Sequence, residues 1–276
     1  MATGGYLLQL GQVPYLEAWD RRYRDAGLTI VGVHTPEFAF EHDAGNVGRA
    51  VRRLGIRYPV VQDNEYGTWD AYANMYWPAD YLVDARGEVR YASIGEGDYD
   101  KTENAIRLLL AEAGGRRLGA GARPRGVVVP SRQATPETYL GTARAQGWVD
   151  GGPKAGRRAY PGARGRLAPN AFALGGTWSI GPQAATAVRG ATIDAQVEAK
   201  NVYLVLSPPR SGRGTVDVLL DGRPVGAGAA GADVRGGRAT VTSQRLYALV
   251  SLPRNERHRL TLRLSPGVAG FAFTFG

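Results

Sequence analysis

The chain of 276 residues contains no cysteine. A polypeptide without cysteine cannot form a disulfide, a thiolate zinc site or an iron–sulfur cluster, and it cannot use a cysteine nucleophile. Histidine is scarce as well, since only His34, His42 and His258 are present, and their spacing does not suit a metal cluster. The sequence therefore predicts no metal site and no cofactor.

Long apolar runs are also missing. No stretch reaches the roughly 18 apolar residues needed to cross a bilayer, and residues 1–6 lack the basic and apolar regions of a signal peptide. Hydrophobic residues make up 43% and charged residues 21%, which is enough to build a core, and the length suits two domains. We expect a folded chain that has, as written, no signal or transmembrane segment.

The charge is unevenly placed, and only three of the 34 basic residues are lysine. Residues 1–114 hold 11 basic and 17 acidic residues (net −6), residues 115–166 hold 11 and 2 (net +9), and residues 167–276 hold 12 and 6 (net +6). The middle stretch is rich in Gly, Pro and Arg and lacks regularly interleaved aromatics. We interpret residues 115–166 as a solvated linker, with 135–141 as the candidate for a short ordered segment, and we do not expect nucleic acid as a partner.

Residues 1–114 alternate between helix and strand patterns. Apolar residues at helical spacing predict a first helix over 16–26, and two continuous apolar runs predict strands buried on both faces, over 28–33 and 58–62. Further elements are expected as helices over 46–54, 65–76 and 102–113 and as a hairpin over 80–93. The order α-β-α-β-α-β-β-α predicts an α/β domain.

Residues 167–276 show a different pattern, with short strands and no helix. The pair Asp221-Gly222 is a two-residue hairpin signal. Strands are expected over 191–199, 202–206, 215–220, 238–242, 245–252, 258–264 and 271–275. Short strands separated by turn signals predict an all-β, jelly-roll-like sandwich.

Several motifs in the first half occur in a characteristic order, GVHTPE at 32–37, YWPA at 76–79, YLVD at 81–84 and GEGDY at 95–99. Together they resemble the thioredoxin-like redoxins, and more closely the extracytoplasmic C-terminal region of DipZ-type proteins. Residues 170–174 and 271–276 are similar to the β-sandwich of the carbohydrate-binding-module kind that this family appends. The resemblance covers nearly the whole chain and implies a thioredoxin-like α/β domain followed by an all-β jelly-roll-like sandwich.

The resemblance implies a bacterial disulfide oxidoreductase, membrane-anchored or periplasmic, connected with cytochrome c biogenesis and supplied with electrons by a membrane partner. Its C-x-x-C pair precedes a helix proline, which Pro14 matches, so Tyr6 and Gln9 occupy the two thiol positions. Pro78 matches the family's cis-proline and, with Trp77, forms the expected platform for a disulfide-bearing peptide or protein substrate. Because both sulfurs are absent, the sequence as written excludes thiol–disulfide exchange by this chain.

Three interpretations follow from this resemblance. The first is an N-terminally truncated fragment, because only residues 1–8 are left to supply the central strand that precedes the family's first helix. The second is a redox-dead protein that keeps the Trp77–Pro78 platform as a binding surface.

The third interpretation is glycan binding by the sandwich, for which the candidate aromatic side chains are Trp178, Tyr203 and Tyr247, although strand alternation is expected to bury many of these rings. His34 and Glu37 are candidates for supporting roles in the first half. Their alternatives are a polar residue at a strand end for His34 and a solvated carboxylate for Glu37.

Overall fold

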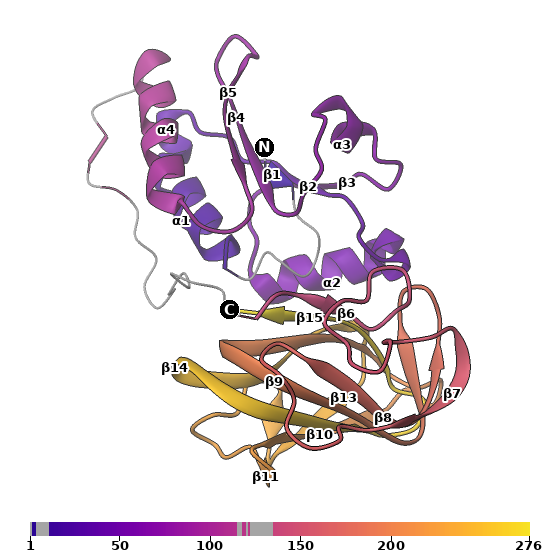
Figure 1. Cartoon of the computed structure of the whole chain (residues 1–276). Helices are drawn as coiled ribbons and strands as arrows, with labels where there is room; N and C mark the ends of the chain where they lie inside the picture. Colours follow the sequence, from indigo (N-terminus) through magenta and orange to yellow (C-terminus); the bar gives the residue numbers. More distant parts are fainter. Residues whose placement is uncertain (1, 4–10, 115–117, 120, 122–134) are drawn as a thin grey trace. The chain divides into compact units, whose positions relative to one another are not determined.

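The computed structural model describes residues 2–3, 11–114, 118–119, 121 and 135–276. The chain divides into two compact units, residues 1–129 and 130–276, which are described separately (Figure 1). The first unit is an α/β domain and the second is built of strands, so both predicted fold classes are confirmed.

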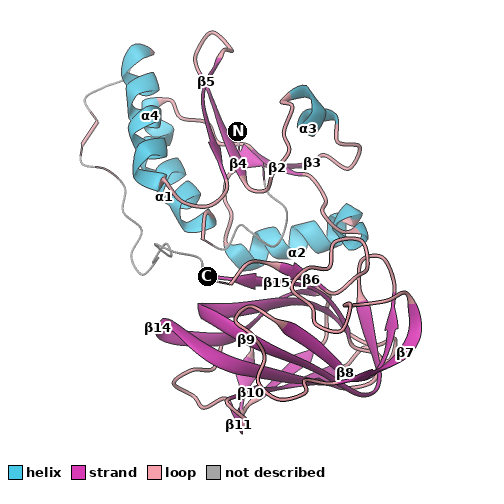
Figure 2. Cartoon of the chain, in the orientation of Figure 1, coloured by secondary structure: helices cyan, strands magenta, loops and turns pink. Residues whose placement is uncertain are grey.

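The first unit has a five-stranded sheet in the order β3-β2-β1-β4-β5. Its strands are β1 (Ala2–Thr3), β2 (Gly32–His34), β3 (Val60–Gln62), β4 (Ala79–Val83) and β5 (Val89–Ile94). Its helices are α1 (Val13–Tyr23), η1 (Arg24–Ala26), η2 (Ala39–His42), α2 (Ala44–Leu54), α3 (Gly67–Ala71) and α4 (Tyr99–Glu112). Figure 2 shows α1 and α4 side by side, where Trp19 and Tyr23 share a buried cluster with Ile106 and Leu110. This cluster is the core of the unit.

Three expectations for the first unit are corrected. Among the described residues β3 pairs with β2 alone, as an edge strand. Val61 is 46% exposed, so the predicted burial of 58–62 on both faces is wrong. The helix expected over 65–76 shrinks to α3, because Tyr66 and Ala73 adopt left-handed backbone conformations (φ 59° and 47°) on either side of it. The strand expected over 28–33 begins only at Gly32.

The central strand of the sheet is present in short form. Ala2 and Thr3 of β1 run parallel to β2 and antiparallel to β4. Residues 1–8, which were expected to supply this strand, therefore contain it at Ala2–Thr3. It gives both neighbouring strands a backbone partner at the centre of the sheet.

The second unit is a sheet of ten strands that folds around one large core (Figure 2). Its strands are β6 (Thr138–Tyr139), β7 (Gly156–Pro161), β8 (Phe172–Ile180), β9 (Ala185–Ser207), β10 (Gly214–Leu220), β11 (Arg223–Pro224), β12 (Val234–Arg235), β13 (Arg238–Val241), β14 (Arg245–Leu264) and β15 (Ala269–Phe275). Asp221 and Gly222 both have positive φ (50° and 81°) and join β10 to β11, so the predicted hairpin is confirmed.

Two pairs of predicted strands are in fact single long strands. β9 covers both 191–199 and 202–206, and β14 covers both 245–252 and 258–264. Register shifts in the β9–β14 ladder accommodate the residues between the predicted strands. An irregular ladder lets a strand bend and continue into the next part of the sandwich instead of ending.

The predicted linker is shorter than 115–166. β6 and β7 lie within that range; β6 pairs with the distant β15, and β7 pairs with β8, the next strand along the chain. Thr135 is buried, and its hydroxyl accepts a hydrogen bond of 2.7 Å from the backbone N–H of Glu198. The ordered second unit therefore includes residues 135–166, whose glycine and arginine content concealed their pairing.

Candidate functional site

The loop between α3 and β4 carries the platform predicted at Trp77 and Pro78. The peptide bond between these residues is cis, as expected. Pro78 is buried and its carbonyl accepts a 2.8 Å hydrogen bond from the backbone N–H of Gly95. The preceding side chains face solvent, since Met75 is 71% and Tyr76 is 56% exposed. The loop thus presents apolar side chains beside a buried proline.

The indole of Trp77 is held in place from two sides. Its Nε1 donates a hydrogen bond of 3.2 Å to the backbone carbonyl of Thr35, just after β2. Its ring lies against Trp69 of α3, with 4.3 Å between ring centroids and 38° between the planes. We call Trp69 and Trp77 the tryptophan pair. Both rings are half-buried, so each keeps a part of its surface open to solvent.

Asn74 fixes the backbone of the same loop. This buried amide donates a 3.0 Å hydrogen bond to the carbonyl of Tyr76, and it accepts a 3.1 Å bond from the hydroxyl of Tyr81 on β4. The loop therefore holds its shape through side-chain bonds to its own backbone and to the sheet.

Asp63, directly after β3, connects the parts of this site. Its carboxylate accepts hydrogen bonds of 2.8 Å from the backbone N–H groups of Thr68 and Trp69 and one of 3.2 Å from the Thr35 hydroxyl. Burial opposes ionisation of Asp63, but these bonds outweigh burial and lower its pKa. Sequence analysis missed this residue, although an aspartate between a strand and a helix is a helix-capping signal.

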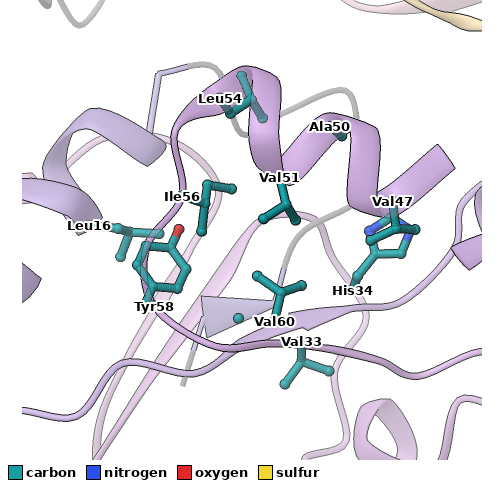
Figure 3. A pocket seen from close by; sticks show the side chains of 11 residues that line it. Leu16, Val33, His34, Val47, Ala50, Val51, Leu54, Ile56, Tyr58 and Val60 are labelled. Atoms are coloured by element: carbon teal, nitrogen blue, oxygen red, sulfur yellow. The ribbon is translucent and has the colours of Figure 1, made fainter. Parts of the chain in front are cut away.

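His34 does not join the tryptophan pair. Its side chain lines a small apolar cavity of about 30 Å³ beneath α2, where its ring lies beside Val47 (Figure 3). Thr35, directly after β2, contacts Trp77 through its backbone carbonyl and Asp63 through its hydroxyl, whereas the His34 side chain lines the cavity. His34 is therefore a buried residue at a strand end.

Glu37 contributes its backbone to the loop that follows β2. The backbone N–H groups of Glu37 and Phe38 both donate to the carboxylate of Glu41, which is fully buried. Glu41, which sequence analysis did not single out, thus holds this loop.

The two thiol positions, Tyr6 and Gln9, lie outside the described residues. Pro14 lies in the first turn of α1, as the resemblance implied. Gln12, at the start of that helix, is buried and donates from Nε2 to Oδ2 of Asp80 over 2.7 Å.

Asp80 is a buried acid two residues after Pro78. Burial raises its pKa to about 6, and the hydrogen bond from Gln12 only partly opposes this shift. Oδ1 of Asp80 and Oε1 of Gln12 find no hydrogen-bond partner among the described residues. Asp80 can therefore gain or lose a proton near neutral pH, between α1 and the strand that follows the platform.

Two of the three aromatic side chains considered for glycan binding are buried in the sandwich. Trp178 and Tyr247 are fully buried, and Trp178 donates from Nε1 to the carbonyl of Gly175 over 2.8 Å. Neither ring can stack on a sugar, which leaves only the half-buried Tyr203 of the three candidates. Glycan binding stays a prediction. Among the described residues, no group of three or more His, Asp and Glu side chains is placed to hold a metal ion.

Comparisons with known proteins agree with this architecture. A protein-family profile described as "Thioredoxin like C-terminal domain" matches residues 135–276. The DipZ proteins of Mycobacterium bovis and Mycobacterium tuberculosis are 38% identical to the chain over 267 residues, which cover 96% of this chain and 36% of DipZ. The chain therefore spans about a third of the length of these relatives.

Shorter relatives match only part of the chain. The thiol-disulfide oxidoreductase YkuV of Bacillus subtilis is 28% identical over 100 residues, covering 36% of this chain and 67% of YkuV. A solved structure described as the solution structure of a thioredoxin-like protein in the oxidized form is 26% identical, covers 40% of this chain and 78% of that chain, and has a TM-score of 0.35.

Proposed function

This chain belongs to the DipZ-type thioredoxin-like proteins, and we propose that it binds extended polypeptides at the Trp77–Pro78 loop without exchanging disulfides. Its residues 135–276 form the thioredoxin like C-terminal domain. One observation carries this proposal: the 276 residues contain no cysteine, while the loop that faces a substrate in the resemblance is intact and anchored.

The absence of cysteine thiols is the reason why the proposal does not include disulfide exchange. Disulfide exchange begins with attack by a thiolate on a disulfide sulfur and passes through a mixed disulfide between the two partners. Neither Tyr6 nor Gln9 offers an atom that can form this bond. In this proposal, a polypeptide bound at the loop keeps its disulfides unchanged.

The exposed side chains of the loop favour a polypeptide with apolar or aromatic residues. Met75 and Tyr76 are adjacent and mostly exposed, and clustered exposed apolar side chains are typical of interaction sites. Trp77 is already immobilised by Thr35 and Trp69, so binding costs little further side-chain entropy there.

The test is binding of a fluorescein-labelled, cysteine-free peptide with alternating aromatic residues, followed by fluorescence anisotropy with the full chain. The double variant Met75→Ser, Tyr76→Ser should weaken binding by about tenfold, since it removes most of the exposed apolar surface of the loop. Leu108→Ser is the matched control, because Leu108 is 60% exposed on α4 of the same unit. Equal losses in both variants, or no binding by the unmodified chain, contradict the proposal.

The other expectations from the resemblance stay predictions. They are a position outside the cytoplasm, a membrane electron donor and a link to cytochrome c biogenesis. Across the described residues, every helix is too short or too polar to cross a membrane.

A further inference from the structure

Asp63 connects both members of the tryptophan pair to one buried carboxylate, and we propose that it is the positioning residue of the polypeptide-binding loop. The predicted effect of Asp63 on peptide binding rests on the proposed function. The effect of Asp63 on the relative orientation of Trp69 and Trp77 can be measured without any peptide.

Each tryptophan is linked to Asp63 by a short path. Trp69 is bonded directly, because its backbone N–H donates to Oδ2 of Asp63 over 2.8 Å. Trp77 is bonded through Thr35, whose hydroxyl donates to the same oxygen over 3.2 Å and whose carbonyl accepts from the Trp77 indole. One carboxylate therefore determines where both rings lie.

α3 depends on Asp63 because it has little stability of its own. It is five residues long, and a helix of that length does not persist without external bonds. Tyr66, immediately before it, holds a left-handed conformation (φ 59°) that is unfavourable for a residue with a side chain. The backbone N–H of Tyr66 donates to the Asp63 carbonyl over 3.0 Å, while the N–H of Thr68 donates to Oδ1 of Asp63 over 2.8 Å.

An amide cannot replace this carboxylate. Oδ1 accepts from Thr68, and Oδ2 accepts from both Trp69 and Thr35, so both oxygens act only as acceptors. In Asp63→Asn one of these oxygens becomes an NH₂ group, which points a donor at another donor. Asp63 is 8% exposed and Thr35 is fully buried, so solvent does not readily replace the lost bond.

The experiment compares Asp63→Asn with Asp43→Asn in the full chain. Asp43 caps α2 in the same unit through a 2.7 Å bond from the backbone N–H of Asn46. Its variant makes the same exchange of aspartate for asparagine at a helix cap without touching the tryptophan pair, and the asparagine oxygen can still accept that bond. Two tryptophans this close give an exciton couplet in far-ultraviolet circular dichroism, which reports their relative orientation. We expect Asp63→Asn to lose most of the couplet and to bind the peptide about tenfold more weakly, as loss of a charged hydrogen bond predicts, and we expect Asp43→Asn to keep both.

The outcomes separate the two proposals. A couplet that persists in folded Asp63→Asn overturns the positioning role. A couplet that disappears in that variant, with no peptide binding by the unmodified chain, supports the positioning role and contradicts the proposed function. If Asp63→Asn does not fold, Thr35→Val serves instead, because it removes only the hydroxyl bond from a fully buried position of similar volume. An unchanged couplet in Thr35→Val then overturns the inference.

Discussion

Replacing Asp80 by Asn should stabilise the first unit at neutral pH and change little in acid. Asp80 is only 5% exposed, and burial raises its pKa from 3.8 to about 6. Its single hydrogen bond in the described structure comes from Gln12, to Oδ2. At pH 7 the folded unit must therefore hold a buried carboxylate with one oxygen that no described group satisfies.

The sign and size of the effect follow from proton linkage. The folded state binds the Asp80 proton more tightly than the unfolded state. The stability that this proton contributes is complete below pH 3.8, the pKa of the unfolded state, and is lost as the pH rises through about 6, the pKa of the folded state. A difference of about 2 in pKa corresponds to about 3 kcal/mol at pH 7. The asparagine side chain of the variant stays neutral, keeps an acceptor for Gln12 Nε2, and carries an N–H for the unpaired Gln12 Oε1.

Urea unfolding at pH 4 and pH 7 measures this effect. All α-helices in the described residues belong to the first unit, so their far-ultraviolet ellipticity follows that unit. Asp84→Asn on the neighbouring turn is the control with opposite sign, because the hydrogen bond from the Glu88 backbone N–H, with help from Arg90, lowers the pKa of Asp84 to about 2. We expect Asp80→Asn to gain and Asp84→Asn to lose stability at pH 7. An equal effect of Asp80→Asn at both pH values would refute the reasoning.

Two further predictions concern the thiol positions and the sandwich. The double variant Tyr6→Cys, Gln9→Cys should reduce an insulin disulfide; a folded variant without activity would show that the thiol positions are assigned wrongly. Gly176→Ala should destabilise the second unit by about 3 kcal/mol, because φ is 75° and a Cβ would lie 2.0 Å from the Gly190 carbonyl oxygen. Thermal unfolding followed by tryptophan fluorescence measures this loss, and Gly156→Ala, which has φ 90° but open space, should cost clearly less.

Local signals predicted the parts of the fold that neighbouring residues decide. The Asp221-Gly222 turn was predicted because both residues tolerate positive φ, and the structure confirms it. The cis bond before Pro78 was expected from the motif around it. By contrast, β6 and β7 were hidden in a basic, glycine-rich stretch, and the partner of β6, β15, lies far away in the sequence.

The candidate site shows the same division. Composition alone determined that this chain has no sulfur for disulfide exchange, because a missing atom is missing in every conformation. The motif around Pro78 also predicted a loop with a cis-proline, which the structure confirms. Only the tertiary structure brought Asp63 to Thr35 and Trp69, and Gln12 to Asp80, because these contacts join separate elements. Whether a carboxylate is a solvated charge, a loop anchor or a buried acid depends on the side chains that folding places around it.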